Sequence, residues 1–197
     1  MPKIVSISGT SRPNNYTSRA LAVVNDELRD HGLDVDLIDA RELHLAFPDT
    51  GRSDDAERLR AAVRAATGVV LATPEYHGSF SAMTKLVIEN LGFPSALRDK
   101  PVALVGVAAG RIGAVKSLEH LRSVCAHVGA IVMPGAVSVA SVQNAFDAEG
   151  NCTNAAVEAM LRSAAESLTK FIKDYVCPKH TLEEMARQEG DPWSTTV

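Results

Sequence analysis

Hydroxyl, amide and guanidinium groups are concentrated near the N-terminus, in the stretch from Ser8 to Ser18. It reads Ser-Gly-Thr-Ser-Arg-Pro-Asn-Asn-Tyr-Thr-Ser and leads into a segment with helical spacing. A helix N-terminus presents free N–H groups and the positive end of the helix dipole, and both favour an anion. The stretch lacks the glycines of the dinucleotide motif and the lysine of the P-loop. We therefore expect a phosphate monoester here, with an ordinary capped turn as the alternative.

A second stretch, Thr73–Ser81, places Tyr76 and His77 beside a glycine. An exposed tyrosine can offer its face to a flat ring. Taken alone, this stretch is explained as well by a half-buried loop aromatic and a solvated histidine. A third stretch, Val107–Gly113, surrounds Arg111 with small residues that let a ligand approach the backbone closely.

The elements that must position these stretches follow from the hydrophobic pattern. Short apolar runs are typical of strands buried on both faces, and they alternate with helical stripes. The runs cover Lys3–Ser8, Val35–Asp39, Val69–Thr73, Val102–Val107 and Ala130–Met133, and Val137–Ser141 extends the last after Pro134-Gly135. This alternation predicts an α/β fold with a doubly wound, five-stranded parallel sheet in the flavodoxin-like order 2-1-3-4-5. The three stretches then follow the carboxyl ends of three strands and border one crevice, which suits a flat, phosphorylated ligand.

The three stretches carry a resemblance to a known family. Gly9-Thr10-Ser11-Arg12, Pro74-Glu75-Tyr76 with Gly78-Ser79, and Gly110-Arg111-Ile112-Gly113 resemble the NADPH-dependent FMN reductase family, which includes flavin, quinone, azo-dye and chromate reductases. The resemblance runs from Pro2 to about Tyr175. This sequence departs from the family pattern at His77, where the family often has asparagine, and in the Ser81–Leu86 segment.

The resemblance implies a cofactor, a reaction and a set of binding residues. The cofactor is FMN, with NADPH or NADH as hydride donor and a flavin, quinone or similar small molecule as acceptor. The flavin carries the chemistry, so no catalytic side chain is expected. The phosphate would be held by Ser11, Arg12, Tyr16, Thr17 and Ser18, and the ring would be lined by Pro74, Glu75, Tyr76, His77 and Gly78 and bordered by Ala109, Gly110 and Arg111.

Other classes of function are less well supported by the sequence. There is no GxSxG elbow, no HExxH and no paired-cysteine zinc pattern, so neither hydrolysis nor a metal site is expected. Two alternatives stay open: a flavodoxin-like electron carrier without a pyridine nucleotide site, and a flavin-free module that reuses the fold.

Composition sets the remaining expectations. The 197 residues carry 20 basic and 24 acidic side chains, and this mild acidity argues against nucleic-acid binding. Three widely spaced cysteines without a CxxC pair favour a reducing compartment. No apolar run is long enough to span a bilayer and no signal-peptide pattern is visible, so we expect a cytoplasmic protein without a membrane partner.

We expect the chain to divide into a flavodoxin-like domain over 1–176 and a polar tail over 177–197. The tail cannot pack alone, so we expect it to be disordered or held by a neighbour. Relatives in the family usually form dimers or tetramers. We therefore expect a homo-oligomer, with Ile88, Leu91 and Phe93 contributing to its interface or, as the alternative, finishing a helix inside the core.

Overall fold

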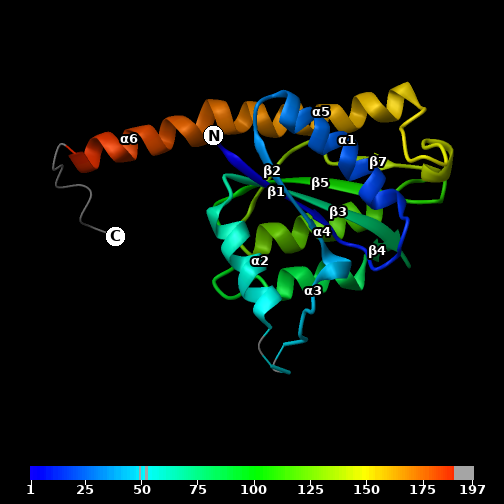
Figure 1. Cartoon of the computed structure of the whole chain (residues 1–197), viewed down its shortest axis with the longest axis horizontal. Helices are drawn as coiled ribbons and strands as arrows, with labels where there is room; N and C mark the ends of the chain where they lie inside the picture. Colours follow the sequence, from blue (N-terminus) through cyan, green and yellow to red (C-terminus); the bar gives the residue numbers. More distant parts are fainter. Residues whose placement is uncertain (49, 52, 189–197) are drawn as a thin grey trace.

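A layered arrangement of helices around one sheet emerges from the computed structural model, which describes residues 1–48, 50–51 and 53–188 (Figure 1). The described elements follow in the order β1 (Lys3–Ser8), α1 (Tyr16–Asp30), β2 (Asp34–Asp39), η1 (Ala40–Glu42), α2 (Asp54–Ala65), β3 (Gly68–Tyr76), β4 (Ser79–Phe80), α3 (Ala82–Glu89), β5 (Pro101–Val107), α4 (Val115–His127), β6 (Ile131–Val132), β7 (Val137–Val139), η2 (Val142–Asn144), α5 (Ala155–Phe171), η3 (Ile172–Val176) and α6 (Cys177–Gln188). No helix among these residues is long and apolar enough to cross a bilayer.

The strands pair in the predicted order. The path is β2-β1-β3-β5-β6, all parallel, and β7 continues the last position by pairing with β5 beyond the break at Pro134-Gly135. Without the short β4, this is the flavodoxin-like order 2-1-3-4-5. Ser8 pairs with Ala72 and Pro74 pairs with Val107, so the chain leaves β1, β3 and β5 at the same edge of the sheet.

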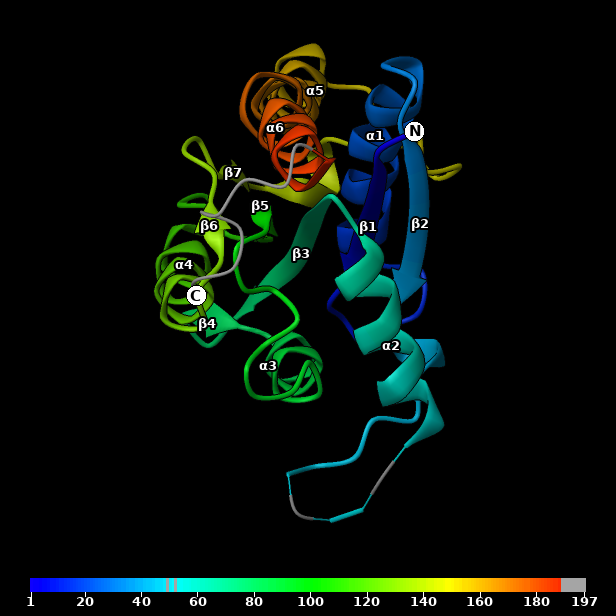
Figure 2. The ribbon, with the colours of Figure 1, turned by 90° about the vertical axis from the view of Figure 1, so that its left-hand side faces the viewer.

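The two faces of the sheet are covered by different helices (Figure 2). Successive strand residues point to opposite faces, so Ile4 packs with α1 and α5, whereas Val5 packs with α2, α3 and α4. Strands covered on both sides must be apolar throughout, which explains the continuous runs in the sequence. The core therefore holds the three carboxyl-terminal strand ends in a rigid frame.

The second stretch is a hairpin rather than a loop. β3 continues to Tyr76, the chain turns at His77 and Gly78, and β4 returns antiparallel with Glu75 opposite Phe80. The turn residues have φ angles of 51° and 74°, and positive φ at both positions is what a two-residue type I′ hairpin turn requires. The sequence expectation missed β4 because a two-residue strand leaves no hydrophobic pattern.

The expected interface residues do not form one surface. Ile88 is 5% exposed and Leu91 is fully buried, so both belong to the core and the alternative interpretation is the correct one for them. Phe93 lies just beyond α3 and is fully exposed. The expected patch was therefore wrong for two of its three members.

The chain beyond α5 stays helical as far as it is described. η3 forms one turn of π-helix and leads into α6, which extends past the edge of the sheet (Figure 1). Residues 177–188 of the predicted tail thus form a polar helix, in which Lys179 pairs with Glu183 one turn ahead at 3.7 Å. Pro192 and Trp193 lie outside the described residues, and the division of the chain at 176 stays a prediction.

Candidate functional site

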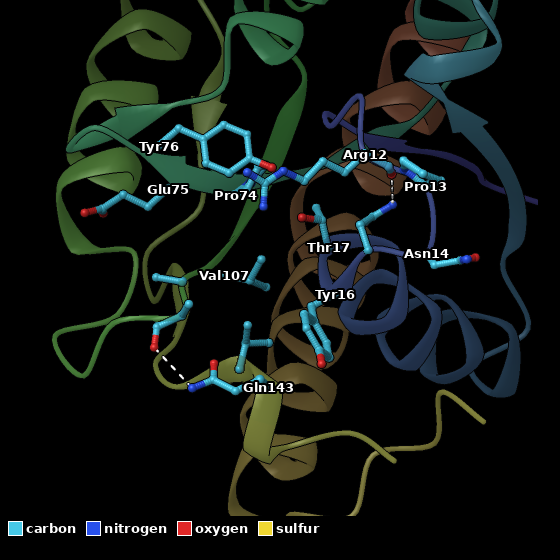
Figure 3. A pocket seen from close by; sticks show the side chains of 14 residues that line it. Arg12, Pro13, Asn14, Tyr16, Thr17, Pro74, Glu75, Tyr76, Val107 and Gln143 are labelled. Carbon is cyan, nitrogen blue, oxygen red and sulfur yellow. Dashed lines mark hydrogen bonds between the residues drawn. The ribbon is translucent and has the colours of Figure 1, made fainter. Parts of the chain in front are cut away.

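A crevice of about 590 Å³ opens at the carboxyl ends of β1, β3 and β5 (Figure 3). This volume is within the roughly 300–1,000 Å³ typical of small-molecule sites. Its walls come from the three predicted stretches and from η2. The lining residues are Arg12, Pro13, Asn14, Asn15, Tyr16, Thr17, Pro74, Glu75, Tyr76, Val107, Ala108, Ala109, Val142 and Gln143.

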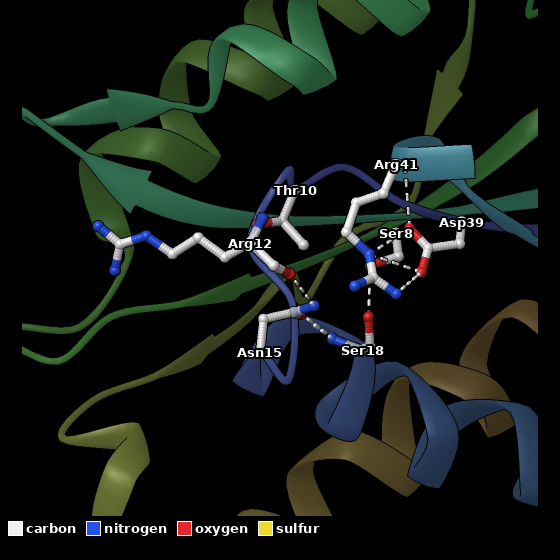
Figure 4. A network of polar contacts seen from close by, with 7 residues as sticks. All are labelled: Ser8, Thr10, Arg12, Asn15, Ser18, Asp39 and Arg41. Atoms are coloured by element: carbon white, nitrogen blue, oxygen red, sulfur yellow. Dashed lines mark hydrogen bonds and ion pairs between the residues drawn. The ribbon is translucent and has the colours of Figure 1, made fainter. Parts of the chain in front are cut away.

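The loop before α1 is shaped by its own side chains (Figure 4). Asn15 caps α1 by accepting a hydrogen bond from Ser18 N at 2.7 Å, and its side-chain amide donates to Arg12 O at 2.8 Å. Thr10 Oγ1 accepts from Arg12 N at 3.3 Å. The cap serves Ser18 N, whereas the first N–H groups of a helix have no intrahelical acceptor. These groups, at Tyr16 and Thr17, border the crevice and can receive an anion.

Arg12 reaches from this loop to the hairpin. Its guanidinium carbon lies 4.9 Å from the centre of the Tyr76 ring, a cation–π distance (Figure 3). In Figure 4 the side chain points away from Asn15 and Ser18. Arg12 is exposed, so its long side chain can also serve the α1 terminus. Arg12, which the sequence predicts to bind the phosphate, therefore contacts Tyr76, which the sequence predicts to line the ring.

Ser11 and Ser18 lie outside the lining of the crevice. Ser11 is exposed, and Ser18 Oγ pairs with Ser8 Oγ at 2.8 Å. Ser18 lines a neighbouring hollow beside Asp39 and Arg41, on the β2 side of α1. Burial alone would raise the pKa of Asp39, but hydrogen bonds from Arg41 outweigh burial and hold that pKa below its ordinary value. The two serines are therefore less well placed for the phosphate than Thr17.

Glu75 has a structural partner within the site. Its Oε2 accepts a hydrogen bond from Ser117 N at 3.1 Å. Ser117 is in the first turn of α4, and Ala114 at the N-cap supplies no side-chain hydrogen bond. Glu75 thus caps α4 from the hairpin, and it places a negative charge at the positive end of that helix.

A second hollow of about 340 Å³ adjoins the crevice and shares Glu75, Ala108 and Ala109 with it. The remaining predicted residues gather there, because it is lined also by His77, Gly78, Gly110, Arg111, Ile112 and Gly113. Ile112 is 85% exposed and offers an apolar surface. The hairpin and the loop after β5 therefore face each other across one continuous depression.

Val142 and Gln143 are site residues that sequence reasoning missed. Gln143 Nε2 donates to Ala109 O at 3.4 Å, which joins η2 to the loop after β5. This segment is held against α1 by Arg19, which donates to Asp147 O at 2.7 Å. The sequence shows only a polar stretch here, because the contact that places it joins residues 128 positions apart.

The donor set fits a phosphorylated, flat ligand. A helix N-terminus with an arginine and hydroxyls lies at one side of the crevice, and Tyr76 with the small residues Ala108 and Ala109 lies at the other. The site lies outside the carboxyl ends of the strands, where open α/β sheets bind ligands.

Comparisons with known proteins identify the family. The family model of NADPH-dependent FMN reductase matches residues 2–144. An NAD(P)H-dependent FMN reductase of Pseudomonas aeruginosa is 31% identical over 178 residues, which cover 87% of this chain and 95% of that protein. An NADPH azoreductase of Bacillus sp. strain OY1-2 is 33% identical over 134 residues, which cover 67% of this chain and 73% of that protein.

Solved structures resemble the chain in fold. The flavoenzyme NAD(P)H:(acceptor) oxidoreductase FerB from Paracoccus denitrificans has a TM-score of 0.74 at 22% identity, over 89% of this chain and 99% of that chain. A flavodoxin from the domain Archaea has a TM-score of 0.63 at 13% identity, over 88% of this chain and 99% of that chain. The predicted flavodoxin-like fold is confirmed.

Proposed function

The chain belongs to the NADPH-dependent FMN reductase family and is an FMN-dependent NAD(P)H oxidoreductase, and from that premise we propose how its residues bind the cofactor. The N-terminus of α1, with Arg12, Tyr16 and Thr17, holds the FMN phosphate. The hairpin from Pro74 to Gly78 lines the ring, and Ala109, Gly110 and Arg111 border its other edge. When bound, FMN supplies the hydride chemistry, while the protein supplies binding and orientation.

One observation carries this proposal. Arg12, Tyr16 and Thr17 of the predicted phosphate set border the same crevice as Pro74, Glu75 and Tyr76 of the predicted ring set, although the two groups are more than 50 positions apart in the sequence. Backbone N–H groups at the α1 terminus suit a dianion, and the face of Tyr76 suits a ring. Ser11 and Ser18 do not contact the ligand in this proposal, and Ser18 instead pairs with Ser8.

The acceptor is proposed to be a quinone or azo compound. One relative is named an NADPH azoreductase. Quinones and azo dyes are flat and largely apolar. The exposed Ile112 beside the crevice offers an apolar surface to them, and Arg111 offers a charge to the phosphates of NADPH. The three free cysteines support a cytoplasmic location, where thiols stay reduced.

A homo-oligomer remains part of the proposal, with a different surface. Phe93 is fully exposed, and Phe47 is 69% exposed. Asn90 Nδ2 donates to Ala46 O at 2.9 Å, so the segment before α2 lies beside the end of α3 and brings the two aromatic residues to one side of the molecule. Light scattering of the wild type and of Phe93→Glu tests this, and a monomeric wild type would contradict it.

The cofactor proposal is tested by titrating the purified protein with FMN and with riboflavin. We expect a flavin spectrum perturbed by binding and a clear preference for FMN. Oxidation of NADPH with a quinone then separates the reductase from an electron carrier. A colourless protein that takes up neither flavin would favour the flavin-free module and contradict the proposal.

A further inference from the structure

Three buried hydroxyl groups lie between the loop before α1 and the hairpin. They belong to Thr73 within β3, three residues before its end, Ser81 just after β4, and Thr84 in the first turn of α3. Thr73 is fully buried, Thr84 is 1% exposed and Ser81 is 3% exposed. We call these three residues the hydroxyl cluster. None of them lines the crevice, so the cofactor proposal does not use them.

The hydroxyl cluster holds the backbone of Gly9, the residue that follows β1. Gly9 O accepts hydrogen bonds from Ser81 Oγ and from Thr84 Oγ1, the latter at 2.9 Å. On its other side, Gly9 N donates to Ala72 O at 2.8 Å. A Cβ at position 9 would lie only 2.1 Å from Thr84 Oγ1, so the contact requires a glycine. The start of the loop before α1, which we call the phosphate loop, is therefore bound directly to α3 and β3.

The same cluster closes the base of the hairpin. Ser81 N donates to Thr73 Oγ1 at 3.1 Å, and Ser81 Oγ accepts from Thr84 N at 3.0 Å. Thr73 Oγ1 in turn donates to Pro74 O at 3.0 Å. Thr73 and Ser81, which flank the hairpin, are thus joined by a hydrogen bond from the Ser81 backbone to the Thr73 side chain, and the side chains of Ser81 and Thr84 join this base to Gly9.

A valine at position 73 or 84 would fill nearly the same volume as threonine. It would leave the Ser81 N–H without its acceptor, or Gly9 O without one of its donors, in an environment from which water is excluded. Unpaired polar groups in such places are costly, and satisfied networks there hold one geometry. The hydroxyls therefore specify an arrangement that packing alone would leave less defined.

We propose that Thr73, Ser81 and Thr84 are positioning residues. They set the separation between the phosphate loop and the hairpin of β3 and β4 that lines the flavin ring. FMN spans both, so the network determines whether one ligand can satisfy both at once. The idea rests on the cofactor proposal above. It predicts that loosening the network costs FMN affinity, whereas riboflavin, which lacks the phosphate, needs the hairpin alone.

The test compares Thr84→Val with Thr84→Ser, which keeps the hydroxyl. Dissociation constants for FMN and riboflavin are measured by fluorescence titration of the flavin-free proteins, well below their unfolding temperatures. For Thr84→Val we expect FMN binding to weaken about tenfold, as for loss of a buried hydrogen bond, with riboflavin binding changed less than about threefold. Thr84→Ser should keep the FMN-to-riboflavin preference of the wild type.

A purely structural role would lower the unfolding temperature and leave that preference unchanged. A folded Thr84→Val with the wild-type preference would overturn the proposal. If Thr84→Val does not fold, Ser81→Ala carries the same comparison, because it likewise removes one of the two donors to Gly9 O, and an unchanged preference there also overturns it. A wild-type protein that binds no FMN would instead refute the cofactor proposal.

Discussion

The carboxylate of Glu75, on the hairpin beside the crevice, accepts a hydrogen bond from the backbone N–H of Ser117 in the first turn of α4. A residue of the Pro74-Glu75-Tyr76 stretch that carries the family resemblance is therefore also the cap of a helix. This contact fixes the hairpin against α4, and it connects the geometry of the ring site to the stability of the fold.

Replacing Glu75 should therefore destabilise the protein. We expect Glu75→Ala to lower the free energy of unfolding by about 0.5–2 kcal/mol, the range for loss of an N-cap, and Glu75→Gln to lose less because it keeps an acceptor. Urea denaturation measures both. The control is Glu119→Ala, which removes an exposed carboxylate from α4, the helix that Glu75 caps. Equal losses of unfolding free energy for Glu75→Ala and Glu119→Ala would contradict the capping role.

Arg12→Ala should discriminate between flavins. If Arg12 serves the phosphate, the variant weakens FMN binding by about 1.5–3 kcal/mol and leaves riboflavin binding nearly unchanged. Arg111→Ala, at the other side of the depression, should leave the FMN preference intact. Equal losses for FMN and riboflavin after Arg12→Ala would show that Arg12 acts through its contact with Tyr76 rather than through the phosphate.

Position 77 should prefer residues that tolerate positive φ. His77 has a φ of 51°, and asparagine adopts this conformation more easily than most residues, whereas β-branched residues avoid it. His77→Asn should retain or raise the free energy of unfolding, and His77→Val should lower it by about 1–3 kcal/mol. Chemical denaturation decides the matter: a valine variant as stable as the asparagine variant would refute the assigned turn.

Cys125 should make stability depend on alkaline pH. Burial raises the pKa of its thiol to about 12 from an ordinary value of 9.0. Between these values the folded protein keeps a proton that the unfolded chain loses, so this contribution to the free energy of unfolding falls as pH rises, by at most about 1.4 kcal/mol per pH unit. In Cys125→Ala the free energy of unfolding should lack this decrease at alkaline pH. Urea denaturation at a series of pH values measures it, and parallel pH profiles of unfolding free energy for wild type and variant would contradict the role of Cys125.

Much of the fold could be predicted because the strands are buried on both faces. Residues such as Val69 and Val102 must then be apolar without interruption, and the strand order follows from right-handed crossovers. The hairpin could not be predicted from the sequence pattern, because β4 has only two residues and the turn before it depends on the φ angles of His77 and Gly78.

The site could be predicted in part for a similar reason. Arg12 and Thr17 follow the end of β1 and Tyr76 is the last residue of β3, so topology brings them to one crevice. Gln143 is placed by contacts between distant segments, and its neighbourhood carries no local signal. The burial of Leu91 beside the exposure of Phe93 likewise depends on how α3 ends against the core.

The most direct test of the account is anaerobic mixing of the FMN-loaded protein with NADPH. The account predicts that NADPH alone bleaches the visible absorbance of the bound flavin, and that a quinone added afterwards restores it. The same experiment with NADH measures the preference between donors. A flavin that stays oxidised under an excess of NADPH and of NADH would contradict the reductase activity and leave an electron carrier in its place.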